Sequence, residues 1–257
     1  MNKSIGFIGG GRMTKIFLQA FANKDVSFSS IVVCDTNSEV LNALKASYPK
    51  ISISDSTGLA AKQDIVLIAL HPPVIMETLE LIKHDVSDHS VVISLAPKIS
   101  IQKMAEGLER TSLIVRLIPN ATSYINEGYN PVCFADGFNA ALKENVMEIL
   151  RYLGHTFEVS EAKLEGYAIM SAMLPTYFWF QWKELIDLGC KIGLTEDESL
   201  NSVRDTMLAA LRTYFYSGLS PDEVIDLVPV KPIGDNEVQI KAIYNEKLIT
   251  LYEKIKP

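Results

Sequence analysis

The chain has 257 residues, of which 48% are hydrophobic and 21% charged, an ordinary balance for a globular protein of two domains or one long α/β domain. A formal net charge of −7 argues against nucleic acid or an anionic membrane as the main partner. The cysteines are far apart and the histidines form no metal-ligand pair, so we expect no metal site and a reducing, cytoplasmic location. No apolar run reaches the roughly 20 residues of a membrane span.

Strand and helix signals alternate through the first half of the chain. Short apolar or β-branched runs predict strands over residues 5–8, 31–33, 51–53, 65–70, 91–95, 113–117, 132–134 and 155–159. Amphipathic segments predict helices between them, for example after Gly11, after Pro72, and over residues 100–108 and 138–153. Strands separated by helices form βαβ units, so we expect an α/β fold with a Rossmann-type doubly wound sheet.

After Val159 the strand signals end and only helical signals remain. They predict helices over residues 161–172, 175–192 and 237–254, with two more started by the capping boxes Thr195/Glu198 and Ser220/Glu223. The segment 175–192 is apolar almost all round and must be buried on every side, which a domain of about 100 residues hardly achieves alone. We therefore expect a dinucleotide-binding domain over residues 1–159 and an all-α domain over residues 160–257 that forms a homodimer.

A glycine loop, Gly9-Gly10-Gly11-Arg12-Met13, directly follows the first predicted strand and opens a helix. In that context the pattern predicts a dinucleotide site: Gly9 makes the tight turn, and Gly11 lets backbone N–H groups approach a pyrophosphate. The helix dipole beyond the loop favours that negative charge. The third position of the pattern is usually Gly or Ala, and here it is Thr14, a departure that leaves the anion site in place.

The second predicted strand leads to Asp35, near the spacing at which an acidic residue accepts hydrogen bonds from the adenosine ribose. A carboxylate there repels a 2′-phosphate and slightly favours NAD over NADP. Thr36, Asn37 and Ser38 follow and offer donors to a phosphate, so both nucleotides stay open as cofactors.

The segment Gly6-Phe7-Ile8-Gly9-Gly10-Gly11-Arg12-Met13 resembles the G-F-I-G-A-G-N-M loop of the pyrroline-5-carboxylate reductases. Later segments follow that family's motifs in order: Ala69-Leu70-His71-Pro72 for A-V-K-P, Ile93-Ser94-Leu95-Ala96 for the strand before A-A-G, Arg116-Leu117-Ile118-Pro119-Asn120 for R-V-M-P-N, Glu127-Gly128 for G-E-G, and Ser171, Pro175 and Tyr177 for S-G-S-G-P-A-Y. The resemblance spans nearly the whole chain. It implies an NAD(P)H-dependent oxidoreductase that transfers hydride to a cyclic imine, with a helical domain that interlocks with its partner.

The resemblance also implies which residues form the site. Cofactor contacts are expected from Gly9, Gly10, Gly11, Arg12, Met13, Asp35, Thr36, Asn37, Ala69, Leu70, His71, Pro72, Ala96 and Asn120. Hydride transfer needs positioning more than a strong acid, because the cofactor carries the reaction. The candidates at the nicotinamide face are His71, Asn120, Ser171 and Tyr177. A helix-capping or cofactor-contacting role is the alternative for His71, and a core role is the alternative for Tyr177.

The substrate side departs from the family. Ala172-Met173-Leu174 replaces Gly-Ser-Gly, and Val230–Asn236 stands where the family's S-P-G-G-T-T loop binds the product carboxylate. Ser171, Lys231 and Gly234 remain as substrate-binding candidates. Charge-assisted hydrogen bonds of roughly 1.5–3 kcal/mol each are lost with the missing hydroxyls, which puts pyrroline-5-carboxylate as the substrate, and a place in proline biosynthesis, in doubt.

Two alternatives to a reductase stay open. A paralogue that lost its substrate loop becomes a nucleotide-binding regulator or sensor without turnover. A β-hydroxyacid dehydrogenase has a neighbouring architecture, but its chemistry uses a lysine one turn beyond a glycine early in the helical domain. Here Gly166 is followed four positions on by Met170, which disfavours that second alternative.

Overall fold

The computed structural model describes residues 3–110 and 113–257. It divides into an α/β unit, Met1–Met173 with Tyr252–Pro257, and a helical unit, Leu174–Leu251. The last strand ends at Glu158, so the change from strands to helices falls where the sequence predicts it. The domain ranges 1–159 and 160–257 stay a prediction.

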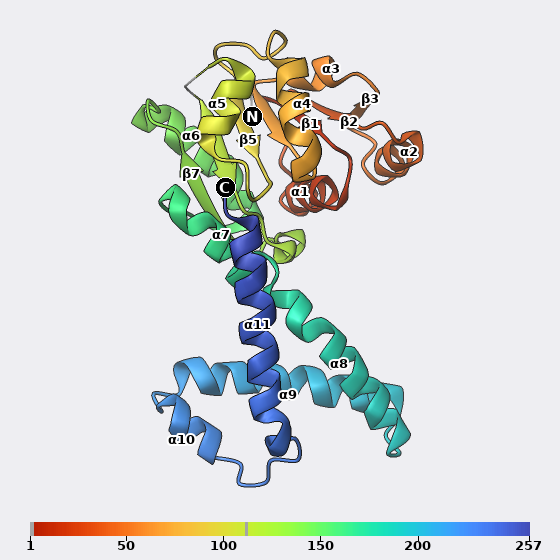
Figure 1. Ribbon diagram of the computed structural model, residues 1–257. Helices are drawn as coiled ribbons and strands as arrows, with labels where there is room; N and C mark the ends of the chain where they lie inside the picture. Colours follow the sequence, from red (N-terminus) through yellow and green to blue (C-terminus); the bar gives the residue numbers. More distant parts are fainter. Residues whose placement is uncertain (1–2, 111–112) are drawn as a thin grey trace. The chain divides into compact units, whose positions relative to one another are not determined.

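The α/β unit is built on one eight-stranded sheet, in the order β3-β2-β1-β4-β5-β6-β7-β8 (Figure 1). Adjacent strands are parallel except β6 and β7. The strands are β1 (Ser4–Ile8), β2 (Ser30–Cys34), β3 (Ser52–Ser54), β4 (Ile65–Ile68), β5 (Val91–Ser94), β6 (Ile114–Leu117), β7 (Gly128–Phe134) and β8 (Gly154–Glu158). The predicted Rossmann-type sheet is confirmed, with the strand order reversing beyond β1, where such sheets bind ligands.

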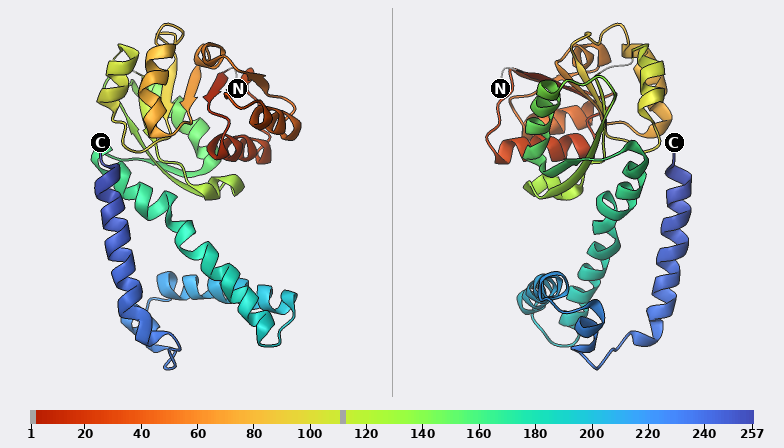
Figure 2. Two further views of the ribbon diagram at one scale, coloured as in Figure 1. Left: turned by 45° about the vertical axis from the view of Figure 1, so that its right-hand side comes forward. Right: turned by 90° about the vertical axis from the view of Figure 1, so that its left-hand side faces the viewer.

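Helices cover both faces of this sheet (Figure 2). Alternate strand residues point to opposite faces, so Ile65 and Leu67 of β4 join one core cluster while Val66 and Ile68 join the other. The first cluster contains buried residues of α1 (Arg12–Asn23), α2 (Ser38–Ser47) and α6 (Ala140–Leu150). The second contains those of α3 (Thr57–Ala61), α4 (Pro72–Ile82) and α5 (Ile101–Leu108).

The segment after β8 is helical over residues 161–172, as the sequence predicts, but its helix type changes along the segment. It begins with the 3-10 turn η3 (Glu161–Lys163), continues as one α-turn, α7 (Leu164–Tyr167), and ends as the π-helical η4 (Ala168–Ala172). The predicted helical segment is therefore confirmed, although only one turn of it is α-helical. Two further 3-10 turns each precede a strand: η1 (Ala121–Ile125) precedes β7, and η2 (Arg151–Leu153) precedes β8. Polar contacts of Ser171 with neighbouring loops, described below, accompany the wide turn of η4.

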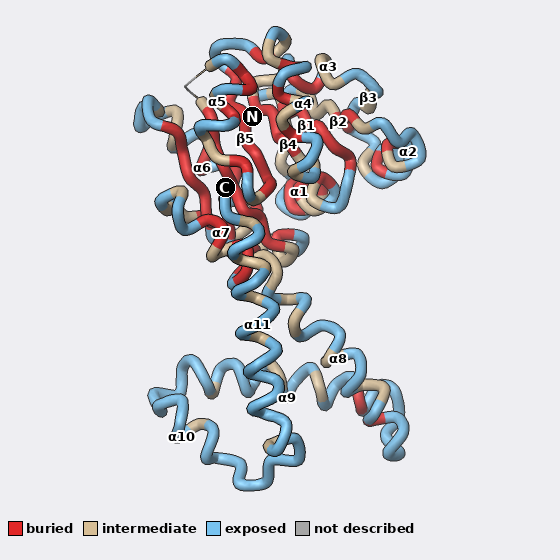
Figure 3. The backbone as a smooth tube through the Cα atoms, in the orientation of Figure 1, coloured by how far each residue is buried: buried red, intermediate tan, exposed pale blue. Residues whose placement is uncertain are grey.

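The helical unit contains α8 (Leu174–Lys191), α9 (Glu196–Tyr216), α10 (Pro221–Asp226), η5 (Gly234–Asn236) and most of α11 (Glu237–Ile255). Both predicted capping boxes are present. Helices α8 and α9 meet where Ser199 Oγ donates to the Ile186 carbonyl at 2.7 Å. Almost every residue of this unit is exposed (Figure 3), large apolar side chains included. Among the described residues, no helix is long and apolar enough to cross a membrane.

Candidate nucleotide site

The glycine loop connects β1 to α1 and lies against the end of β4. Gly9 has φ +105°, a conformation that favours glycine, and a Cβ there would lie 2.5 Å from the Ala69 carbonyl oxygen. The Ala69 N–H donates to the Ile8 carbonyl at 2.8 Å, which fixes the two strand ends together. Glycine is thus required at position 9 for two reasons: its φ is positive, and a Cβ would collide with the Ala69 carbonyl.

The N-terminus of α1 faces open space. Gly11 is its N-cap, no side chain caps it, and a Cβ on Gly11 would meet nothing within 4 Å. Uncapped N–H groups with room in front of them suit a pyrophosphate. Thr14 is fully buried and its hydroxyl donates to the Gly9 carbonyl at 2.5 Å, so the departure from Gly or Ala ties the helix to the loop.

Asp35 follows β2 and fastens two loops. One carboxylate oxygen accepts from the Gly10 N–H at 2.7 Å, and the other accepts from the Asn37 N–H at 2.8 Å. Asn37 in turn caps α2, with its side-chain oxygen accepting from the Glu39 N–H at 2.9 Å. The carboxylate therefore has a fixed position beside the glycine loop, while Thr36 lies exposed next to it.

The loops after β4 and β5 follow the glycine loop along the carboxyl edge of the sheet. Ala96 is buried, while His71 is exposed at the N-cap position of α4 and makes no side-chain cap bond. The capping alternative for His71 is therefore not what the structure shows. Pro72 occupies the first turn of α4, which suits a residue without an N–H. Leu70 is half-buried, with a Cδ 3.1 Å from where a Cβ on Gly9 would lie.

Asn120 and Ser171 are in direct contact, although they are far apart in sequence. The Asn120 side-chain amide donates to the Ser171 carbonyl at 2.8 Å, and its oxygen accepts from Thr122. The Ser171 hydroxyl donates to the Tyr129 carbonyl at 3.0 Å, and both Asn120 and Ser171 are nearly fully buried. The structure thus brings two predicted catalytic residues together, each already held by protein partners.

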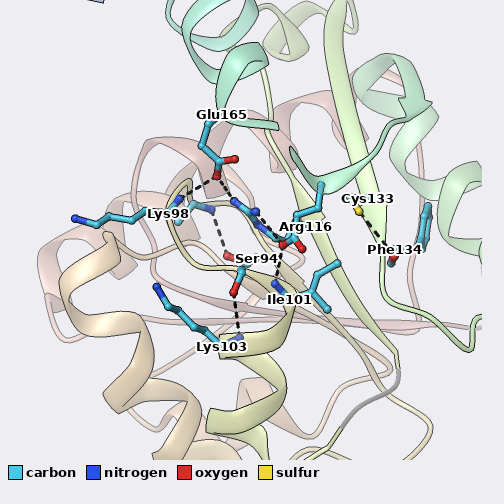
Figure 4. A network of polar contacts seen from close by, with 11 residues as sticks. Ser94, Lys98, Ile101, Lys103, Arg116, Cys133, Phe134 and Glu165 are labelled. Carbon is cyan, nitrogen blue, oxygen red and sulfur yellow. Dashed lines mark hydrogen bonds and ion pairs between the residues drawn. The ribbon is translucent and has the colours of Figure 1, made fainter. Parts of the chain in front are cut away.

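Arg116 is fully buried at the end of β6 and is held by two carboxylates (Figure 4). Its guanidinium donates to Glu165 at 2.5 Å and to Glu161 at 3.0 Å. The same Glu165 oxygen accepts from the Lys98 N–H at 3.2 Å, and the same Glu161 oxygen accepts from the Ile101 N–H at 2.7 Å. This Arg116 network therefore fixes the middle of the loop between β5 and α5 and the start of α5.

The sequence analysis did not identify Glu161, Glu165 and Lys98 as members of this network. An arginine inside an apolar strand does signal a buried acidic partner, because a lone buried charge is very costly. Glu161 and Glu165 lie four residues apart near the start of the helical segment, where both can face one neighbour. Nothing in the sequence alone indicates the backbone conformation of Lys98.

Tyr177, Lys231 and Gly234 belong to the helical unit. The Tyr177 ring lies 6.3 Å from the Tyr244 ring, and burial raises the pKa of its hydroxyl above the usual value. Lys231 is exposed, and its carbonyl accepts from the Gly234 N–H at 3.0 Å, closing the turn before η5. Their roles toward cofactor and substrate stay predictions. The described residues contain no group of three or more side chains suited to a metal ion.

Comparison with known proteins agrees with this geometry. Residues 4–98 match the family model described as "NADP oxidoreductase coenzyme F420-dependent". The pyrroline-5-carboxylate reductase of Corynebacterium melassecola is 27% identical over 194 residues, 74% of this chain and 72% of that protein. That of Methanosarcina acetivorans is 23% identical and covers 99% of this chain and 97% of its own. The crystal structure of Plasmodium falciparum pyrroline carboxylate reductase, with NADP bound, superposes with a TM-score of 0.80 at 22% identity, covering 99% of this chain and 95% of that one.

The sheet, its glycine loop and the matching family model define an NAD(P)-dependent oxidoreductase of the Rossmann type. Within that class the chain resembles the pyrroline-5-carboxylate reductases along nearly its whole length, and this predicted resemblance is confirmed.

Proposed function

We propose that this protein is an NAD(P)H-dependent reductase that transfers hydride to the carbon–nitrogen double bond of a small cyclic imine. The observation that carries the proposal is the uncapped N-terminus of α1 facing open space, with Gly9 against Ala69 and Asp35 fixed beside it. The bound nicotinamide supplies the hydride. The residues of the protein bind and orient the cofactor and the substrate and shield both from water.

The chain's residues fit this cofactor in three places. The backbone N–H groups of Gly11, Arg12 and Met13 would hold the pyrophosphate, since no side chain caps this end of α1. The turn from Asp35 to Asn37 meets the adenosine ribose. The loop residues Ala69, Leu70, His71, Pro72 and Ala96 at the ends of β4 and β5, together with Asn120, would hold the nicotinamide half.

NAD is the preferred nucleotide. The Asp35 carboxylate is held by the Gly10 and Asn37 N–H groups, so it cannot turn aside to admit a 2′-phosphate without losing both bonds. Asp35→Ser is expected to weaken NADH binding about tenfold and to improve NADPH binding relative to it. Fluorescence titration of both nucleotides measures this; tighter binding of NADPH by the unaltered protein contradicts the preference.

The predicted catalytic residues divide into two kinds. His71 is exposed, lacks a capping bond and can exchange a proton with the substrate nitrogen. Asn120 and Ser171 are buried and bonded to protein groups, so their role is to hold neighbouring backbone in place. His71→Asn is expected to lower kcat about 100-fold, the scale of general acid catalysis, with a much smaller change in the dissociation constant of NADH. Stopped-flow turnover with NADH measures the loss, and unchanged kcat removes His71 from the mechanism.

We also propose a homodimer formed by the helical unit, and a cytoplasmic location. The dimer accounts for exposed aromatic residues such as Trp179, Phe180 and Phe215, which a single copy leaves in water. Three cysteines without a disulfide suit a reducing compartment.

A regulator or sensor without turnover is the second candidate, favoured by the altered stretch Val230–Asn236. Nucleotide titration followed by assay of cyclic imine reduction, and of proline oxidation at high pH, separates the two. Nucleotide binding with turnover supports the reductase. Binding without turnover of any cyclic imine supports the sensor, and binding of neither nucleotide contradicts both.

A further inference from the structure

A cavity of about 310 Å³ lies at the amino edge of the sheet, where β1, β4 and β5 begin beside α6. This is the edge opposite the glycine loop, and the five residues of β1 separate the two by roughly 17 Å. The volume is at the lower end of the range of small-molecule sites, about 300–1,000 Å³. The proposed reductase function makes no use of this cavity.

The floor of the cavity is apolar. It is formed by four buried aliphatic side chains, two from the sheet and two from α6: Ile65, Val91, Val146 and Ile149. Asn145 shares a face of α6 with Leu142 and Ile149, which are three and four residues away, and all three line the cavity. An apolar residue at position 145 would complete the stripe of α6, whereas asparagine places a polar amide at the rim.

Asp64 holds a carboxylate in a fixed position at the rim. One of its oxygens accepts from the Ser4 N–H at 2.7 Å and from the Ser4 hydroxyl at 2.9 Å. The backbone of Asp64 is fixed as well, because its N–H donates to the same hydroxyl and its carbonyl accepts from the Val91 N–H, both at 2.9 Å. The second carboxylate oxygen makes no hydrogen bond to a described residue and is open to solvent. The fold thus uses half of this carboxylate, and the other half is available to a cation.

Hydrogen-bond donors flank Asp64 on both sides. Lys3 precedes β1 and His89 precedes β5, while Asp64 precedes β4, which lies between those two strands. The side chains of Lys3 and His89 line the cavity, and neither makes a hydrogen bond or ion pair with a described residue. Glu148 of α6 is the remaining charged residue of the rim. Exposed charges are commonly just solvated, so the argument depends on their arrangement: a fixed carboxylate between two donors, above an apolar floor.

We propose that this cavity binds a free α-amino acid with an aliphatic side chain. The Asp64 carboxylate pairs with the ammonium group, Lys3 and His89 bind the carboxylate, and the aliphatic side chain lies on the floor. A ligand with a single charge leaves the opposite groups of the rim without a partner, and a ligand without an apolar body leaves the floor in water. The site is separate from the nucleotide site, and the proposal does not depend on the reductase function.

Isothermal titration calorimetry of the full chain with L-leucine tests the site. Two leucine analogues are matched probes, since 3-methylbutylamine lacks the carboxylate and 4-methylpentanoate lacks the ammonium group. Each is expected to bind at least tenfold more weakly than leucine. Saturating NADH is expected to change the affinity for leucine less than twofold, because the glycine loop lies at the opposite edge of the sheet.

Three variants locate the bound leucine. Asp64→Asn keeps an oxygen that accepts from Ser4 but removes the charge, and it is expected to weaken leucine binding at least tenfold. Asp25→Asn is the matched control, because Asp25 is an exposed aspartate of a different cavity, and its affinity for leucine is expected to stay unchanged. Asn145→Leu is expected to fill the cavity and abolish binding without lowering the unfolding temperature, which shows that the fold is intact.

Four results would overturn the proposal. Unchanged leucine binding by Asp64→Asn or by Asn145→Leu places the ligand elsewhere, and equal affinity for leucine and its single-charge analogues removes the role of the charged rim. Competition between leucine and NADH assigns the amino acid to the nucleotide site. Absence of binding by the unaltered protein at about 10 mM leucine contradicts the inference directly.

Discussion

The α/β unit and the helical unit place their apolar side chains in opposite ways. In the α/β unit, strands and helices enclose two clusters, and residues such as Phe7, Phe17 and Ile75 are fully buried. In the helical unit, Trp179 and Phe180 are 47% and 67% exposed. One unit completes its core within a single chain, whereas the other presents apolar helix faces that need a further surface to cover them.

The largest expected effect is in the α/β unit, at the Arg116 network. Arg116→Ala leaves Glu165 buried without its partner, which costs about 3–5 kcal/mol of unfolding free energy. Urea denaturation measures the loss. The control is Arg151→Ala, which breaks the exposed pair with Glu144 and is expected to change nothing measurable. Equal stability of the two variants would show that the buried network does not support this unit.

The second effect tests whether the helical unit is completed by another copy. Phe180→Glu is expected to weaken the homodimer about 30-fold, or about 2 kcal/mol, because a charge enters an apolar interface. Leu81→Glu is the control, since Leu81 is equally exposed at 66% but lies on the α/β unit. Sedimentation equilibrium measures both. If the unaltered protein is a monomer, or if both variants weaken the dimer equally, the helical unit does not form the dimer interface.

Sequence patterns predict most of the α/β unit because its signals are local. Buried parallel strands give short apolar runs, and the glycine loop keeps its spacing because Gly9 must pass close to Ala69. The strand β3 is displaced by one residue from its predicted range, as expected for an edge strand with little apolar pattern. The dinucleotide site is therefore readable from the first 40 residues or so.

The parts that sequence alone did not predict depend on contacts across long separations. Arg116 meets Glu161 and Glu165 only after β6 and α7 have folded together, and Ser171 meets Asn120 in the same way. These contacts accompany the change of helix type along η3, α7 and η4. In the helical unit the helices were predicted correctly, but the surface that covers them is not encoded by periodicity within one chain.

The smallest expected effect concerns the stability cost of residues with a left-handed backbone (positive φ) in each unit. Among the described residues of the helical unit such positions are the glycines Gly193 and Gly218, whereas in the α/β unit five residues with a Cβ also adopt this backbone, Lys98 among them. Lys98→Gly is expected to be about 1 kcal/mol more stable than Lys98→Ala, because both lose the charge and only glycine releases the strain.

Gly193→Ala, where a Cβ would meet nothing within 4 Å, is expected to lose about 1 kcal/mol through backbone strain alone. Thermal unfolding of the three variants measures both differences. Equal stability of Lys98→Gly and Lys98→Ala would mean that the Arg116 network has relaxed the loop, and that lysine stands at position 98 at no cost to the fold. A clear difference means that the left-handed backbone at position 98 costs stability for any residue with a Cβ.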